Sequence, residues 1–108
     1  MVHNYIPIQD VALGYAEISS KLGYYVSLTN NYVSNDNHKI LLMINGIRSY
    51  KLSIINLMHQ IIETIEILKY RNNNNITESI LSYESYLHKI KYLSSVMFPF
   101  FDKYLSNP

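Results

Sequence analysis

The sequence contains no cysteine, and this absence limits the chemistry that the chain supports. Disulfide bonds, thiol catalysis and thiolate metal sites are excluded, while the redox state of the compartment stays open. Glycine and proline are scarce, with three residues of each. Because Gly14, Gly23 and Gly46 are isolated, the chain has no glycine-rich phosphate loop and no Gly-x-Ser-x-Gly motif. We therefore expect no bound cofactor.

A large net charge of either sign is also missing, since the chain has nine basic and eight acidic residues. Nucleic-acid binding usually needs clustered Lys and Arg, so it is not expected. Two carboxylates, Glu63 and Glu66, interrupt the one dispersed basic series. That series consists of Lys39, Arg48, Lys51, Lys69 and Arg71.

Long apolar runs are absent as well, and the longest spans only residues 40–44. A membrane-spanning helix needs about 20 apolar residues, and the N-terminus lacks the pattern of a signal peptide. We therefore expect a soluble, cytoplasmic protein without a membrane partner.

The sequence is rich in Ile (15), Asn (12) and Tyr (11), while Ala and Arg occur twice each. The abundant residues have AT-rich codons and the scarce ones GC-rich codons, which indicates an AT-rich genome. Low-GC bacteria, their phages and plasmids, some large DNA viruses and a few protists fit this composition, and a virus- or phage-encoded protein would act in the host cytoplasm.

Apolar residues recur with helical spacing through nearly the whole chain, which predicts a single all-α domain over residues 1–108. We expect an antiparallel bundle of three main helices at about 8–33, 38–70 and 76–98, joined by short connections. Residues 1–7 form an extended leader. One face of the first helix carries Ile8, Val11, Tyr15, Ile18, Leu22 and Tyr25, and the third helix carries Ile80, Tyr83, Leu87, Ile90, Leu93 and Met97.

The middle helix has a wide apolar arc, and only Lys51 breaks its repeat. At ~100° per residue the arc covers about 160°, which is typical of a helix with neighbours on two sides. Its members are Ile54, Ile55, Leu57, Met58, Ile61, Ile62, Ile65 and Leu68. Because three short helices leave part of so wide an arc uncovered, the pattern also favours self-association.

Several boundaries have alternatives. The first helix ends at Gly23 or continues, and Gly46 kinks or splits the second. Strand-favouring residues at 24–29, together with 40–45, allow a hairpin at 24–45, which would make the fold α+β. Residues 75–78 resemble a capping box that begins with Asn75. Pro99 ends or kinks the third helix near Met97, after which an aromatic C-terminal segment folds back onto the core.

Two stripes of titratable residues have spacings compatible with metal binding. His59, Glu63 and Glu66 form the first stripe, opposite the apolar arc, and Glu84, His88 and Lys91 form the second. Both fit solvated helix faces, and neither contains a recognised metal motif. We therefore expect no metal site.

Small helical ribonucleases use an arginine and a histidine that lie a few residues apart on one helix. Here Arg48 and His59 are separated by about three helical turns, and Arg71 and His88 lie on either side of a loop. Acid–base catalysis needs both groups within reach of one proton. The sequence therefore favours a protein without enzymatic activity.

Tyrosine and phenylalanine are the residues most suited to a contact surface, because aromatic side chains are enriched at protein interfaces. The candidate interaction residues are Tyr50, Tyr70, Tyr86, Tyr92, Phe98, Phe100, Phe101 and Tyr104.

Three functions follow, in this order. The first is a non-enzymatic, self-associating interaction module. The second is a small phage-, plasmid- or virus-encoded inhibitor or adaptor that binds a host protein. A metal-dependent or ribonuclease-like enzyme is the third.

Overall fold

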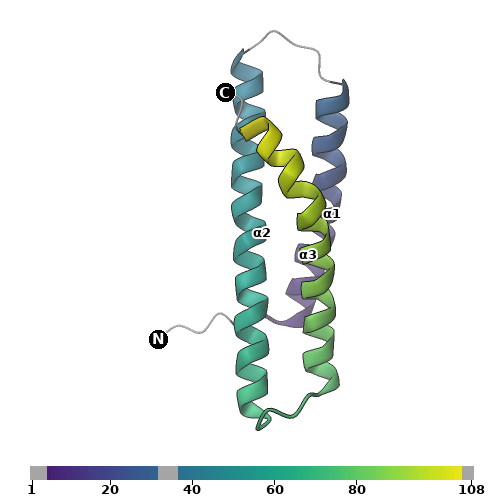
Figure 1. Cartoon of the computed structure of the whole chain (residues 1–108), viewed down its shortest axis with the longest axis vertical. Helices are drawn as coiled ribbons and strands as arrows, with labels where there is room; N and C mark the ends of the chain where they lie inside the picture. Colours follow the sequence, from purple (N-terminus) through teal and green to yellow (C-terminus); the bar gives the residue numbers. More distant parts are fainter. Residues whose placement is uncertain (1–4, 32–36, 106–108) are drawn as a thin grey trace.

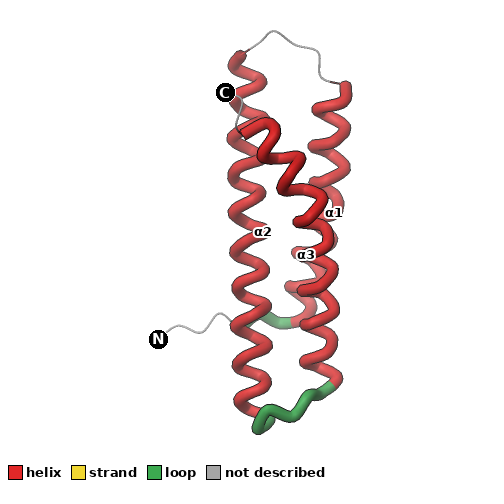
Figure 2. The backbone as a smooth tube through the Cα atoms, in the orientation of Figure 1, coloured by secondary structure: helices red, strands yellow, loops and turns green. Residues whose placement is uncertain are grey.

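The computed structural model describes residues 5–31 and 37–105, and these residues form three helices without a strand. The helices are α1 (Ile8–Asn31), α2 (Asn37–Arg71) and α3 (Glu78–Leu105). They run antiparallel in a bundle of 58 × 27 × 20 Å (Figure 1). The predicted all-α fold is confirmed, and the alternative hairpin at 24–45 is wrong, because its described residues are helical (Figure 2).

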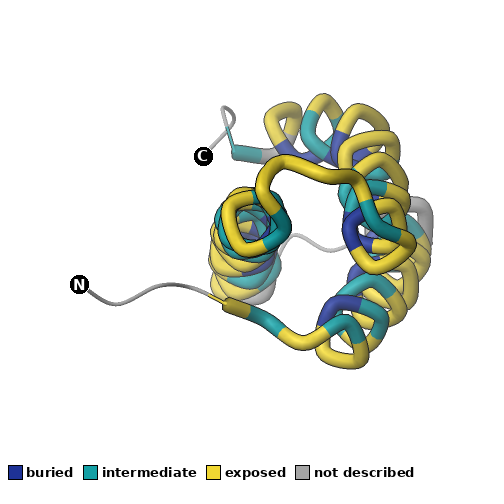
Figure 3. Tube along the Cα trace, turned by 90° about the horizontal axis from the view of Figure 1, so that it is seen from below, coloured by how far each residue is buried: buried dark blue, intermediate teal, exposed yellow. Residues whose placement is uncertain are grey.

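The buried residues of each helix lie on the sides that face the other helices (Figure 3). Val11, Ile18 and Tyr25 recur every seven residues on the buried side of α1. In α3 the predicted inner face is also confirmed, and Ser94 and Phe101, which the sequence analysis did not place on it, are buried as well. The Ser94 hydroxyl donates to the carbonyl of Ile90 at 2.8 Å, so its burial leaves no unmet donor.

The arc of α2 packs against both neighbours, as its width predicts. Ile54, Ile61 and Ile65 are buried, and the other five members of the arc are half-buried. The bundle therefore covers most of the arc, and the self-association that the arc favours stays a prediction. Lys51 interrupts the repeat where the end of α3 crosses α2. Its ammonium group lies 2.8 Å from the Asp102 carboxylate and 5.0 Å from the centre of the Phe98 ring.

Both interior glycines that were candidate helix breaks are part of continuous helices. Gly23 lies within α1, and α2 passes through Gly46 without interruption. A Cβ atom at Gly46 would lie 3.2 Å from the hydroxyl oxygen of Tyr25. The missing side chain therefore gives the Tyr25 ring room between α1 and α2.

The loop between α2 and α3 departs from the predicted cap. Asn73 and Asn74 adopt φ values of 52° and 64°, a left-handed conformation that asparagine tolerates better than most residues. The N-cap of α3 is Thr77 and not Asn75, because the Thr77 hydroxyl accepts the amide hydrogen of Ile80 at 3.3 Å.

α3 continues past Pro99 to Leu105, so the predicted end near residue 98 is wrong. Proline removes one helical hydrogen bond and crowds the preceding turn, which bends a helix. The last turns of α3 lean toward α2 (Figure 1). This direction buries Phe101 completely, and burial of so large a side chain offsets the cost of the proline.

Residues 5–7 of the predicted leader are non-helical and dock onto the bundle. The backbone amide of Ile6 donates to the Thr64 hydroxyl at 3.0 Å, and the Tyr83 hydroxyl donates to the Ile6 carbonyl at 2.8 Å. Residues 1–4 of that leader, and residues 32–36 between α1 and α2, lie outside the described residues. Within the described ranges, no helix is long and apolar enough to cross a bilayer.

Candidate functional site

Two of the candidate interaction residues belong to the core. Tyr50 is 9% exposed and Phe101 is fully buried. Both pack edge-on against Tyr25, with ring centres 5.8 and 6.0 Å away. In the folded chain they hold the three helices together and offer no contact surface.

The other aromatic candidates are spread over the molecule. Tyr70 is 85% exposed near the end of α2. Tyr86 is half-buried against Tyr15, with ring centres 6.0 Å apart, and Phe98 lies under the Lys51 ammonium group. The side chain of Tyr104 lies outside the described part of the structure. Among the described side chains, Tyr70, Tyr86 and Phe98 do not gather into one patch.

A shorter apolar surface does occur on α3, and we call it the α3 stripe. It consists of Tyr92, Val96 and Phe100, which are spaced by four residues and share one side of the helix. Tyr92 is 67% exposed, Val96 is 51% exposed and Phe100 is half-buried. Sequence analysis missed Val96, although the i, i+4, i+8 pattern was available to find it.

The titratable stripes do not converge on a metal-binding geometry. No group of three His, Asp or Glu side chains among the described residues is close enough to hold a metal ion. His59 and Glu66 are exposed on α2. Glu84 forms an ion pair with Lys69 at 3.5 Å, which links α3 to α2.

The residues considered for nucleic-acid or ribonuclease chemistry are also separate. Arg48 is exposed on α2, whereas Arg71 lies over the ring of Tyr5, 5.6 Å from its centre. Lys51 and Lys69 each face a carboxylate of α3. The basic series therefore forms no continuous positive surface over its described side chains.

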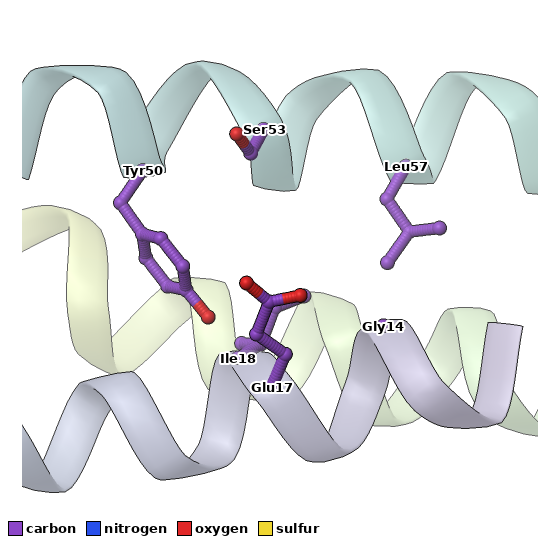
Figure 4. A pocket seen from close by; sticks show the side chains of 6 residues that line it. All are labelled: Gly14, Glu17, Ile18, Tyr50, Ser53 and Leu57. Carbon is purple, nitrogen blue, oxygen red and sulfur yellow. The ribbon is translucent and has the colours of Figure 1, made fainter. Parts of the chain in front are cut away.

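A cleft of about 210 Å³ opens between α1 and α2. At one end Leu57 sits against Gly14, where a Cβ atom would lie only 2.7 Å from the Leu57 Cδ2 atom. Toward the other end, Tyr25 packs over Gly46. The side chains between these contacts reach into the space that separates the helices (Figure 4). The cleft is lined by Gly14, Glu17, Ile18, Tyr50, Ser53 and Leu57.

Two polar groups face each other across this cleft. The Tyr50 hydroxyl is buried and has no hydrogen-bond partner, and Glu17 of α1 lies beside it (Figure 4). Burial raises the pKa of Tyr50, and the nearby Glu17 carboxylate and Tyr25 raise it further. Tyr50 therefore stays neutral and keeps its proton for donation. The sequence analysis did not identify Glu17 as a site residue, because the cleft depends on how two helices approach each other.

Comparison of the chain with protein-family models, curated proteins and solved structures found no match.

Proposed function

We propose that this chain is a non-enzymatic helical interaction module that self-associates through the α3 stripe. The observation that carries the proposal is the exposure of Tyr92 and Val96, two adjacent apolar side chains that are each more than half accessible. Adjacent exposed apolar residues favour a protein contact. A 108-residue chain also has a small core, so burial in a dimer adds substantially to its stability.

A twofold axis near Val96 gives the simplest arrangement. In an antiparallel α3–α3 pair, Tyr92 of one copy lies opposite Phe100 of the other, and the two Val96 side chains meet at the centre. The same surface is then used on both copies, as a closed dimer requires.

Light scattering over a hundredfold range of concentration tests this proposal. The expected result is a dimer that Val96→Asp dissociates, because an aspartate at the centre of the contact buries a charge. Leu52→Asp is the matched control, since Leu52 is similarly exposed but lies on α2; this variant should remain dimeric. A monomer at every concentration would contradict self-association.

A second candidate is a different partner chain, such as a cellular or host protein. Lys89 and Lys103 flank the α3 stripe, and the antiparallel pairing above would bring these like charges together. That juxtaposition favours a partner helix with an apolar centre and acidic ends. A monomeric chain that binds such a helix, and loses it in Val96→Asp, would support this candidate.

The non-enzymatic part of the proposal has its own test. Purified chain should hold no stoichiometric metal and should not cleave RNA. RNA cleavage that disappears on replacement of His59 or His88 would contradict this part.

A further inference from the structure

The cleft between α1 and α2 contains one polar group that the fold leaves without a partner. The Tyr50 side chain is more than nine-tenths buried, and its hydroxyl has no hydrogen-bond partner among the described residues. Buried hydroxyl groups are nearly always paired. The Tyr50 ring packs edge-on against that of Tyr25, with ring centres 5.8 Å apart, so the hydroxyl is held in place and does not swing out to solvent. Its partner therefore has to come to it through the cleft.

The partner that Tyr50 lacks is a hydrogen-bond acceptor. Tyr50 keeps its proton, because burial and then the nearby Glu17 carboxylate raise its pKa, so its hydroxyl is a donor. The Ser53 hydroxyl also lines the cleft, but it turns back along α2 and donates to the Ser49 carbonyl at 3.1 Å. Among the side chains that line the cleft, Tyr50 is therefore the donor that still needs an acceptor.

Glu17 limits which acceptors enter. Its carboxylate lies beside the Tyr50 hydroxyl without accepting from it (Figure 4). Because Glu17 is exposed, its side chain changes rotamer readily and uncovers the hydroxyl. A negatively charged ligand would be repelled by this carboxylate, and a ligand that carries only donors would leave Tyr50 unpaired. These two conditions select a neutral molecule with an acceptor oxygen.

The remaining walls are apolar and limit the size of the ligand. Leu57 and Ile18 line the cleft, and Gly14 contributes no side chain. A cavity of roughly 150 Å³ accommodates benzene, so the volume of about 210 Å³ found here admits roughly eight non-hydrogen atoms. A short aliphatic chain fills such a volume.

We propose that the α1–α2 cleft binds a small neutral carbonyl compound, whose oxygen accepts the Tyr50 hydroxyl hydrogen and whose aliphatic chain packs on Ile18 and Leu57. A ketone or aldehyde oxygen accepts without bringing a donor of its own, so the ligand adds no new unpaired group to the cleft. The hydrogen bond orients the molecule, and the apolar walls supply most of the affinity. The site is independent of self-association, which uses α3.

The first test is a titration of the full chain with methyl propyl ketone, followed by amide chemical shifts. The backbone signals of Gly14 and Ser53, which lie on the two sides of the cleft, should shift and saturate. The n-butylammonium ion has the same chain length but only donors, and it should bind far more weakly. No shift at Gly14 and Ser53, or equal affinity for both compounds, would overturn the proposal.

Tyr50→Phe removes only the hydroxyl and separates its hydrogen bond from the packing of the cleft. Methyl propyl ketone should bind this variant about fivefold more weakly, as expected for the loss of one hydrogen bond. n-Butyl chloride has the same chain length and no strong acceptor, so its affinity should not fall. The free variant should also melt a few degrees higher, because an unpaired buried hydroxyl is lost. A lower melting temperature, or an equal loss of affinity for both ligands, would contradict the role given to Tyr50.

Glu17→Gln tests the exclusion of anions and does not depend on how Tyr50→Phe folds. Pentanoate should bind this variant about threefold more tightly than it binds the unmodified chain, since an exposed repulsion is removed. The affinity for methyl propyl ketone should stay the same. Glu66→Gln removes a carboxylate from an exposed site elsewhere on α2, and it should change neither affinity. Pentanoate binding that is equal in Glu17→Gln and Glu66→Gln would overturn the placement of the ligand beside Glu17.

Discussion

Replacing each glycine by alanine separates helix propensity from packing in this bundle. All three glycines lie inside helices, and none has a positive φ. Alanine therefore fits the backbone at each position. In a helix interior, alanine is about 0.8–1.0 kcal/mol more favourable than glycine, so the three substitutions start from the same expected gain and differ only in what the new methyl group meets.

The surroundings of the three positions differ clearly. At Gly23 nothing lies within 4 Å of a new Cβ atom, so Gly23→Ala should raise the free energy of unfolding by about 1 kcal/mol. For a chain of 108 residues this corresponds to about 4 °C in melting temperature. At Gly46 the Tyr25 hydroxyl oxygen, 3.2 Å away, must move by a few tenths of an ångström. The net gain at Gly46 should therefore be close to zero.

Gly14→Ala should be the least favourable substitution. The new Cβ atom would lie 2.7 Å from the Leu57 Cδ2 atom, so the end of the half-buried Leu57 side chain has to shift, away from its preferred rotamer if its neighbours leave no other room. An off-rotamer side chain costs about 0.5–1.5 kcal/mol, and lost packing adds to this cost. The expected order of stability is Gly23→Ala, then Gly46→Ala, then Gly14→Ala.

Urea unfolding followed by circular dichroism measures these differences. Leu57→Ala, alone and combined with Gly14→Ala, completes a double-mutant cycle that isolates the contact. In the Leu57→Ala background, Gly14→Ala should recover most of its propensity gain. A Gly14→Ala variant as stable as Gly23→Ala would refute the close contact of the Leu57 side chain with Gly14 of α1.

Three further predictions concern the core. Thr64→Val should expose the Ile6 amide to hydrogen exchange and cost about 1–2 kcal/mol, whereas Thr64→Ser should keep that amide protected. Burial raises the pKa of Tyr83 from 10.0 to about 12. The stabilisation linked to its proton is therefore complete below pH 10 and is lost between pH 10 and 12, at about 1.4 kcal/mol per pH unit; Tyr83→Phe should make the measured decline shallower. Phe101→Ala should cost about 3–5 kcal/mol, against less than about 0.5 kcal/mol for the control Tyr70→Ala, measured by urea unfolding, because Tyr70 is exposed and lies outside the α3 stripe.

Each of these predictions has a contradicting result. Protection of the Ile6 amide in Thr64→Val would show that residues 5–7 are held by other contacts. An unchanged alkaline decline in Tyr83→Phe would mean that other tyrosines, such as Tyr50 with its raised pKa, account for all of it. Equal losses for Phe101→Ala and Tyr70→Ala would contradict the packing of the last turns of α3.

The helices and their buried faces were predictable, because the spacing of apolar residues indicates which side of a helix is buried. The end of α3 was not predictable from the local rule for proline. Burial of Phe101 outweighs the lost hydrogen bond of Pro99, and that comparison requires knowing where α2 lies. The cap at Thr77 was similarly hidden, since Asn75 and Thr77 are both good N-cap residues and the pattern does not choose between them.

The candidate site depended still more on three-dimensional contacts. Tyr50 appeared to be a surface residue, yet the passage of Tyr25 over Gly46 places it in the core. Glu17 and Ser53 lie far apart in sequence and line one cleft, at a place where Gly14 lets α1 approach Leu57. Neither contact leaves a periodic signal in the sequence.

The order in which the helices pack has a consequence for biosynthesis. α2 and α3 share the largest interface, and α1 and α2, which are made first, share the smallest. In a nascent chain that has completed α2, packing α2 against α1 therefore adds little stability. The apolar faces of both helices stay exposed until α3 is made. Folding during translation should be late, and the growing chain presents apolar surface to chaperones or to aggregation until its third helix leaves the ribosome.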